Sequence, residues 1–247
     1  MIGWSMAASW HSGPVSLRPV SAYAAAMRIL ALDGALARAS AAVWTEGRVA
    51  AAAQADGARG QAVALPPMAA RVLREAGLAA PELDAVAAVV GPGGFTGLRA
   101  ALALAQGLAL GAGCPAFGVT TGEALLAALP PASRAGRPAW SVTDTRRGHL
   151  LLESFAPDAE TPEGPPRPFD LAALSPPPEG LVLVGDMAPL VAAALRERGA
   201  APWLSDSLLP EAGAVAALVA RRLASGLPLR PALPLYVEPP AVRGPHD

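Results

Sequence analysis

The sequence contains no lysine: all 19 basic residues among its 247 positions are arginines. A Walker-type phosphate loop needs a Gly-Lys-Ser/Thr core, so the absence of lysine excludes it. A single cysteine, Cys114, excludes a disulfide framework and is typical of a reducing compartment. We interpret it as a small buried residue and not as a nucleophile. The net charge of -1 gives the chain no overall field that would attract nucleic acid or an anionic membrane.

Long hydrophobic runs are also missing. No stretch reaches the roughly 18 uninterrupted apolar residues of a membrane span, because Arg99 and Gln106 interrupt the nearest candidate. Residues 1–26 lack the basic-then-apolar order of a secretory signal. We interpret them as a disordered extension or as the result of a start codon assigned too early. We therefore expect a cytoplasmic protein without a membrane segment.

The chain is organised around a glycine-rich stretch, Gly91–Arg99, that separates a buried strand from an apolar helix. Such a loop either presents amides to a phosphate or makes a tight turn that simply packs, and generic chemistry favours packing. Its glycine spacing does not fit a dinucleotide fingerprint. Thr96 is a plausible N-cap of the helix. Within the helix, Ala103, Gly107 and Gly111 form a flat strip of small residues, which predicts close approach by a partner.

The remaining pattern alternates strands and helices, which predicts two α/β units. We expect a first lobe over 27–130 and a second lobe over 131–240, with the last helix packing back on the first lobe, and a tail over 241–247. The expected strands are 28–32, 40–44, 48–52, 84–90, 116–119, 139–144, 149–155 and 181–186. The expected helices are 65–76, 97–112, 122–129, 188–198 and 211–224. The first of these has a clear amphipathic stripe, with Pro66 and Pro67 expected in its first turn. The proline-rich residues 156–180 are expected to be a surface excursion.

Several segments of the chain, in the order in which they occur, resemble segments of the TsaB (YeaZ) family. The most specific is the Gly91–Arg99 block, Gly-Pro-Gly-Gly-Phe-Thr-Gly-Leu-Arg. Weaker matches are Ile29–Asp33, Leu65–Met68, Ala105–Gly111, Asp144–Arg146, Val184–Asp186 and Pro234–Val237. The resemblance implies the actin-like, sugar-kinase-like (ASKHA) ATPase fold. It also implies a non-catalytic subunit that pairs with a TsaD-type transferase in threonylcarbamoyl modification of adenosine 37 in tRNA.

The resemblance places partner contacts on the first-lobe helices. The expected interface residues are Leu65, Met68, Val72, Arg99, Ala103, Gly107 and Gly111. A TsaE-type ATPase is expected to join the pair, tRNA to be met only through the complex, and the isolated chain to be able to form a homodimer. ATP and magnesium are expected to belong to the partners, so no cofactor and no metal site are expected here.

Candidates for a vestigial nucleotide site are Asp33, Gly34, Gly93, Gly94, Thr96 and Asp144, with no catalytic residue among them. For Asp33 and Asp144 the alternative, acids that cap turns, is the favoured interpretation. Two departures from the family pattern argue against catalysis: Gly34-Ala35 replaces the usual hydroxyl residues, and Gln61 replaces a common histidine. The three histidines, His11, His149 and His246, form no i, i+4 metal pair. The alternatives are an active phosphotransferase or ATPase of the same fold and a glycoprotease-like peptidase.

Overall fold

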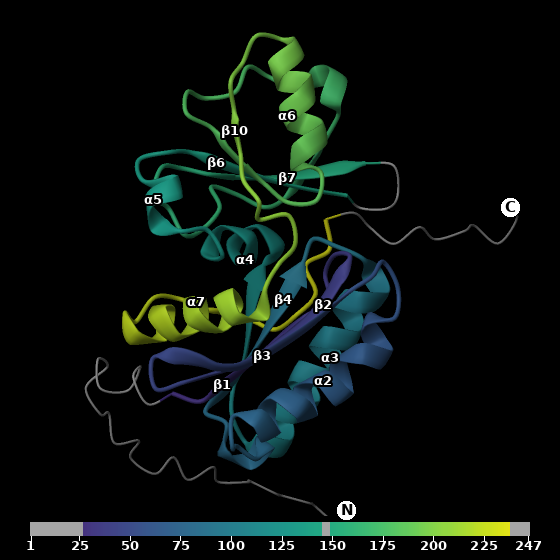
Figure 1. Ribbon diagram of the computed structural model, residues 1–247, viewed down its shortest axis with the longest axis vertical. Helices are drawn as coiled ribbons and strands as arrows, with labels where there is room; N and C mark the ends of the chain where they lie inside the picture. Colours follow the sequence, from purple (N-terminus) through teal and green to yellow (C-terminus); the bar gives the residue numbers. More distant parts are fainter. Residues whose placement is uncertain (1–26, 145–148, 238–247) are drawn as a thin grey trace, which may run out of the picture.

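The computed structural model describes residues 27–144 and 149–237, which form two stacked α/β lobes (Figure 1). Helix α4 (Thr121–Ala127) lies between them. The predicted extension (1–26) and tail (241–247) lie outside the described residues, as do Thr145 and Arg146 of the Asp144–Arg146 motif.

The first lobe is built on a six-stranded mixed sheet with the order β11-β5-β4-β1-β2-β3. Its strands are β1 (Ile29–Asp33), β2 (Arg38–Thr45), β3 (Arg48–Asp56), β4 (Ala85–Gly91), β5 (Ala116–Thr120) and β11 (Arg230–Pro231). A hairpin turn at Glu46-Gly47 joins β2 to β3, which match the expected strands 40–44 and 48–52, and both turn residues have the positive φ that a tight turn needs. β1 pairs antiparallel with β2 and parallel with β4.

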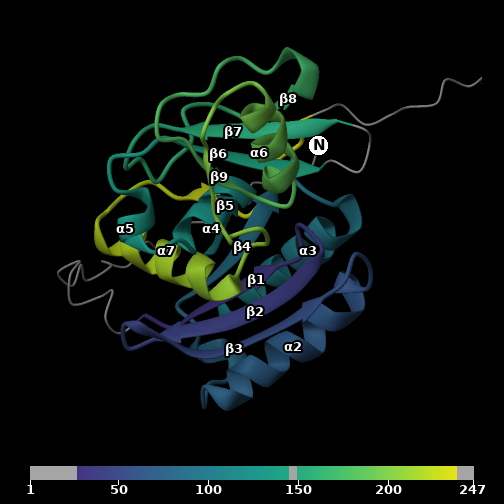
Figure 2. The ribbon, with the colours of Figure 1, turned by 45° about the horizontal axis from the view of Figure 1, so that its top comes forward.

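Both faces of this sheet are buried. On one face, Leu30 and Leu32 pack against α2 (Gln61–Glu75) and α3 (Phe95–Ala112); on the other, Ile29 and Ala31 pack against α7 (Ala212–Ala224) (Figure 2). The last helix therefore covers the first lobe, although it follows the second lobe in sequence. The 3-10 turn η1 (Ala80–Glu82) connects α2 to β4.

The second lobe carries a five-stranded sheet with the order β10-β9-β6-β7-β8. Its elements are β6 (Ala139–Asp144), β7 (Leu150–Phe155), β8 (Arg167–Phe169), β9 (Val182–Val184), β10 (Trp203–Leu204), α6 (Ala188–Glu197) and the turn η2 (Leu171–Ala173). The short helix α5 (Pro131–Arg134) lies in the segment between the lobes. The proline-rich residues 156–180 contribute β8, an edge strand, to this sheet.

Two expectations about helix starts were wrong. Helix α2 begins at Gln61, so Pro66 and Pro67 lie beyond its first turn. Its early start is fixed by contacts outside the helix, because the Gln61 side chain donates to the carbonyls of Leu36 (3.1 Å) and Gly57 (3.0 Å). Both prolines are exposed, which leaves water free to reach the carbonyls that lose an amide partner.

The N-cap of α3 is Gly94 and not Thr96, which lies exposed in the first turn. The helix begins earlier because the loop before it is held against the β1 turn. By length and composition, α3 is the one helix in the described part of the chain that could cross a membrane. It packs instead on β4, β1 and α2.

Candidate functional site

The glycine-rich loop after β4 packs directly on the turn that follows β1. A Cβ atom on Gly34 would lie 2.7 Å from the carbonyl oxygen of Gly97, and one on Gly97 would come still closer to the carbonyl oxygen of Gly34. Gly93 faces the carbonyl of Ala35 in the same way, and the amide of Gly94 donates to that carbonyl at 2.6 Å. A side chain cannot occupy such a gap, so these contacts require glycine. Close packing explains the loop without a phosphate.

Asp33 ends β1 directly beneath this loop and is fully buried. Its Oδ1 accepts the amide of Ala35 at 2.9 Å, the geometry of a turn-capping acid. Its Oδ2 is buried with no hydrogen-bond partner among the described residues. Burial raises the pKa of Asp33 to about 7, with the Ala35 amide opposing the shift. The Asp33 carboxyl therefore has a pKa near neutrality, and one of its oxygens is used to stabilise a backbone turn.

The candidates for a vestigial nucleotide site are not all in one place. Asp33 and the three glycines meet where the loop contacts the β1 turn. Thr96 is exposed on α3, and Asp144 ends β6 in the other sheet, where its amide donates to Oδ1 of Asp186 at 3.2 Å. Two of the six candidates thus belong to different surroundings from the other four.

The outer face of α3 is open. Arg99, Ala103, Gly107 and Gly111 are all exposed, and apart from the adjacent backbone of α3 itself no heavy atom of the described residues lies within 4 Å of a Cβ placed on either glycine. Leu110 beside them is 85% exposed. The opposite face of the helix is buried in the core. The predicted strip of small residues therefore faces outward and is available to another molecule.

Two predicted interface residues need correction. Leu65 and Val72 on α2 are fully buried, in the core cluster between α2, α3 and the sheet. The amphipathic stripe that suggested them is the face that α2 turns to its own lobe, so they support the helix and cannot contact a partner. Met68 is half-buried at the edge of that core. On the outer side, Val63 is 79% exposed.

A segment that includes the weak family match Pro234–Val237 lies along α3. We call residues 230–237 the C-terminal strap; its end is the yellow segment beyond α7 in Figure 1. The side chain of Gln106 donates to the carbonyl of Ala232 at 2.7 Å, and the amide of Leu235 donates to the carbonyl of Val90 at 2.9 Å. The signal in the sequence was the isolated polar pair Arg99 and Gln106, each of which finds a partner in the strap.

Charged residues that the sequence did not connect join the lobes around α4. Glu123 is buried, accepts the amide of Thr120 at 2.6 Å in a capping box, and pairs with the buried Arg222 of α7 at 3.0 Å. Arg230 of the strap lies 3.6 Å from the same carboxylate. The Thr-x-x-Glu spacing was a visible capping signal, but the arginines are contributed by distant segments.

Glu153 of β7 reaches this junction from the second lobe. Its Oε2 accepts the amide of Gly122 at 2.8 Å, while Oε1 is buried without a partner among the described residues. Burial raises the pKa of Glu153 to about 7, and the nearby Glu123 adds to the rise. A Cβ on Gly122 would lie 2.7 Å from Oε2, so a glycine is needed for this contact too. The carboxyl joins the two lobes.

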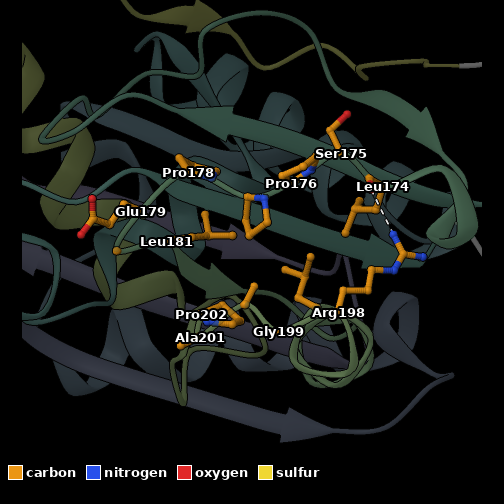
Figure 3. Close-up of a pocket in the computed structure, with 14 residues that line it drawn as sticks. Leu174, Ser175, Pro176, Pro178, Glu179, Leu181, Arg198, Gly199, Ala201 and Pro202 are labelled. Atoms are coloured by element: carbon orange, nitrogen blue, oxygen red, sulfur yellow. Dashed lines mark hydrogen bonds between the residues drawn. The ribbon is translucent and has the colours of Figure 1, made fainter.

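The second lobe contains a cavity of about 450 Å³ between α6 and the proline-rich segment (Figure 3). Its walls include Pro176, Pro178, Leu181 and Pro202. The one arginine in its lining, Arg198, donates to the carbonyls of Leu171, Leu174 and Ala172 at 2.9, 3.0 and 3.3 Å. This cation anchors the proline-rich segment, and none of the predicted site residues lines the cavity.

Metal-binding and nucleophilic groups do not gather in the described ranges. No three His, Cys, Asp or Glu side chains there converge as a metal site would require. His149 is exposed, and His11 and His246 lie outside those ranges. Cys114 is half-buried, and burial raises the pKa of its thiol. A thiol shifted in this direction is not activated as a nucleophile.

Known proteins resemble both the sequence and this arrangement. Residues 55–161 match the family model of TsaD, described as tRNA N6-adenosine threonylcarbamoyltransferase. The chain is 41% identical over 95 residues to the tRNA threonylcarbamoyladenosine biosynthesis protein TsaB of Escherichia coli (strain K12), which covers 38% of this chain and 41% of that protein. It is 50% identical over 62 residues to the tRNA N6-adenosine threonylcarbamoyltransferase of Maricaulis maris (strain MCS10), covering 25% and 16%. The chain thus spans less than half the length of these curated relatives.

A solved structure extends the likeness across both lobes. YeaZ from Pseudomonas aeruginosa superposes with a TM-score of 0.72 and 26% identity, covering 85% of this chain and 99% of that one. This agreement, together with the two α/β lobes, confirms the predicted actin-like, sugar-kinase-like fold class. The match to the TsaD family model includes the glycine-rich loop and the open face of α3.

Proposed function

The chain belongs to the TsaB (YeaZ) family, and from that premise we propose that it is a non-catalytic subunit of tRNA threonylcarbamoyladenosine biosynthesis. In this role it pairs with a TsaD-type transferase and supports the transfer of a threonylcarbamoyl group to adenosine 37. A TsaE-type ATPase joins the pair, and tRNA is met through the complex in the cytoplasm. The adenylate that donates the threonylcarbamoyl group, ATP and magnesium are bound by the partners.

The open face of α3 is the observation that carries this proposal. Its small residues leave room for another helix to approach closely, and Arg99 and Leu110 flank them. A standard interface buries roughly 1,600 Å² in total, and its centre tolerates little intrusion. The face lies within the residues that match the TsaD family model. A TsaD-type partner therefore carries a related segment that can pair with it in a nearly symmetric way.

The chemistry of the loop supports an accessory role. The glycines that could have held a phosphate are packed against backbone carbonyls, and the Asp33 carboxyl caps its own turn. Neither group is arranged to polarise a substrate. The protein contributes a surface, and the partner contributes the reacting groups.

Substitution of Gly107 by leucine tests the pairing. The position is open, and leucine favours helix over glycine by about 0.8 kcal/mol, so G107L leaves the fold intact. It places a bulky side chain at the centre of the strip and holds the partner helix away. We expect binding to a purified TsaD-type transferase, measured by isothermal titration calorimetry, to weaken at least about 30-fold, the scale of a hot-spot loss.

The matched control is Ala193→Leu, on the exposed side of α6 in the second lobe. It adds a leucine to a helix surface away from α3 and should leave the affinity unchanged. Equal binding by wild type and G107L would place the interface elsewhere. Size measurements on both proteins alone show whether the isolated chain self-associates through the same face.

Depletion in cells tests the function itself. Mass spectrometry of bulk tRNA nucleosides should show loss of threonylcarbamoyladenosine when the protein is absent, and recovery on re-expression of wild type but not of G107L. Undiminished threonylcarbamoyladenosine after depletion would overturn the assignment.

A further inference from the structure

The C-terminal strap contacts Arg99, the one arginine of α3. Nη2 of Arg99 donates to the hydroxyl of Tyr236 at 2.7 Å. The guanidinium carbon lies 3.9 Å from the centre of the Phe95 ring and 5.8 Å from that of Tyr236. The planar cation is thus placed between two aromatic rings, one from α3 and one from the strap. Stacking of this kind fixes the plane of a guanidinium.

This arginine remains exposed although it is held in place. Phe95 is 49% exposed and Tyr236 is 56% exposed, so the rings flank the guanidinium without covering it. Within the described ranges no carboxylate forms a salt bridge with Arg99. Only one of its five N–H groups is used by Tyr236. A fixed fork of donors with no acid is suited to a carboxylate from outside the chain.

The residues around Arg99 indicate what kind of partner surface would carry that carboxylate. Helix α3 contains no acidic residue, so its outer face carries the uncompensated positive charge of Arg99. Leu233, also in the strap, is an exposed apolar residue. Arginine and tyrosine in an apolar setting are the residues that most often dominate binding energy at interfaces. The matching occupant is a helix of small residues with an Asp or Glu side chain at its end.

We propose that Tyr236 is a positioning residue that holds Arg99 for a carboxylate of the TsaD-type partner, which makes the strap part of the docking surface beside α3. The proposal rests on the proposed function, because it names the partner of the same α3 face. The strap follows residue 161, where the match to the TsaD family model ends, so it is separate from the segment the two families share. It therefore gives this chain its own contribution to an otherwise nearly symmetric pair.

A double-mutant cycle separates positioning from ordinary packing. Arg99→Ala, Tyr236→Phe and the double variant are compared by calorimetric titration against a purified TsaD-type transferase at low and high salt, with melting temperatures measured in parallel. We expect R99A to weaken binding about 30-fold or more and to reduce its salt dependence. Y236F keeps the ring, loses only the hydroxyl, and should weaken binding about fivefold.

The double variant tests whether Tyr236 acts through Arg99. If Tyr236 acts through Arg99, R99A/Y236F should bind no worse than R99A, within about twofold, while Y236F leaves the melting temperature within about 2 °C of wild type. Arg99→Lys keeps the charge but not the fork, and should fail to restore affinity. Arg221→Ala is the matched control. It removes an exposed arginine of α7, which pairs with Glu160 at 2.6 Å, and it should not change binding.

Three outcomes would overturn the inference. Unchanged affinity in Y236F, with wild type binding normally, would show that the strap does not contribute and would leave the proposed function standing. A Y236F effect of equal size with and without Arg99 would mean that Tyr236 contacts the partner directly. Failure of the wild-type protein to bind any TsaD-type transferase would remove the proposed function itself.

Discussion

Glycines in two regions of the first lobe have opposite surroundings: one set is packed against backbone and the other is open to solvent. In the loop and the β1 turn, the Cα atoms of Gly34, Gly93 and Gly97 lie against backbone carbonyls, so a methyl group cannot be added without moving the chain. On the outer face of α3, Gly107 and Gly111 meet nothing within 4 Å among the described residues apart from the adjacent backbone of α3 itself. The first set is required by the fold. The second set lowers helix stability and is useful only if something else comes close.

The comparison shows that a glycine-rich sequence can be packed or open, and that the two cases call for different tests. Substitution in the packed set should harm stability and affect binding only through the fold. Substitution in the open set should improve stability and harm binding. A result that reversed these assignments would remove the physical basis for placing the partner on α3.

The largest effect is expected for Gly97→Ala. Its Cβ would press against the carbonyl of Gly34, which belongs to a buried turn and cannot move freely. We expect the free energy of unfolding, measured by urea titration, to fall by about 3 kcal/mol, at the upper end of overpacking costs. Gly94→Ala is the matched control, because its nearest atom is 3.5 Å away and its φ of -65° suits any residue. A G97A loss no larger than that of G94A would contradict the packed interpretation.

The contact between Gly122 and Glu153 is the polar counterpart of this packing and should give the protein a pH dependence. The raised pKa of Glu153, about 7, means that the folded protein keeps a proton which the unfolded chain loses near its ordinary pKa of 4.5. Stability from this group is complete below that value and is lost as the pH rises through about 7. Asp33, with a pKa also raised to about 7, acts in the same direction.

Glu153→Gln should remove this group's share of the pH dependence. The amide oxygen can still accept from Gly122, and no charge develops. We expect E153Q to be more stable than wild type at pH 8, by at most about 3 kcal/mol, because one pKa unit corresponds to about 1.4 kcal/mol. At pH 5 the two proteins should have similar free energies of unfolding. Urea titrations at both values measure the difference. Parallel pH profiles for the two proteins would show that the Glu153 carboxyl does not bind its proton as described.

The smallest effect should come from the open set. Gly107→Ala adds a methyl group to a solvent-facing helix position and should stabilise the protein by about 1 kcal/mol. For a chain of this size that corresponds to a rise in melting temperature of about 2–4 °C. Calorimetry or circular dichroism measures the shift. A fall in melting temperature would mean that the strip touches its own lobe, and the binding loss expected of G107L would then need a folding explanation.

Much of the first lobe could be predicted from the sequence because its signals are local. The apolar runs predicted the buried strands β1 and β4, the expected strands 40–44 and 48–52 lie within β2 and β3, and the expected helix end at residue 76 lies one residue beyond the end of α2. The open strip on α3 was visible from its spacing, and its outward direction agrees with that prediction. The direction of α2 was read wrongly, because periodicity identifies one apolar face but does not say whether that face meets its own sheet or a partner.

The sequence by itself indicated the TsaB (YeaZ) family, the order of the main strands and helices, and the strip of small residues on α3. Tertiary structure alone decided that α2 starts at Gln61, that Glu153 reaches Gly122, and that the strap holds Arg99. Tyr236 is 137 positions from Arg99 along the chain, and Ala232 is 126 positions from Gln106. Periodicity and turn chemistry act over a few residues, so they set each element. Which distant donor meets which acceptor depends on how the packed elements bring their surfaces together.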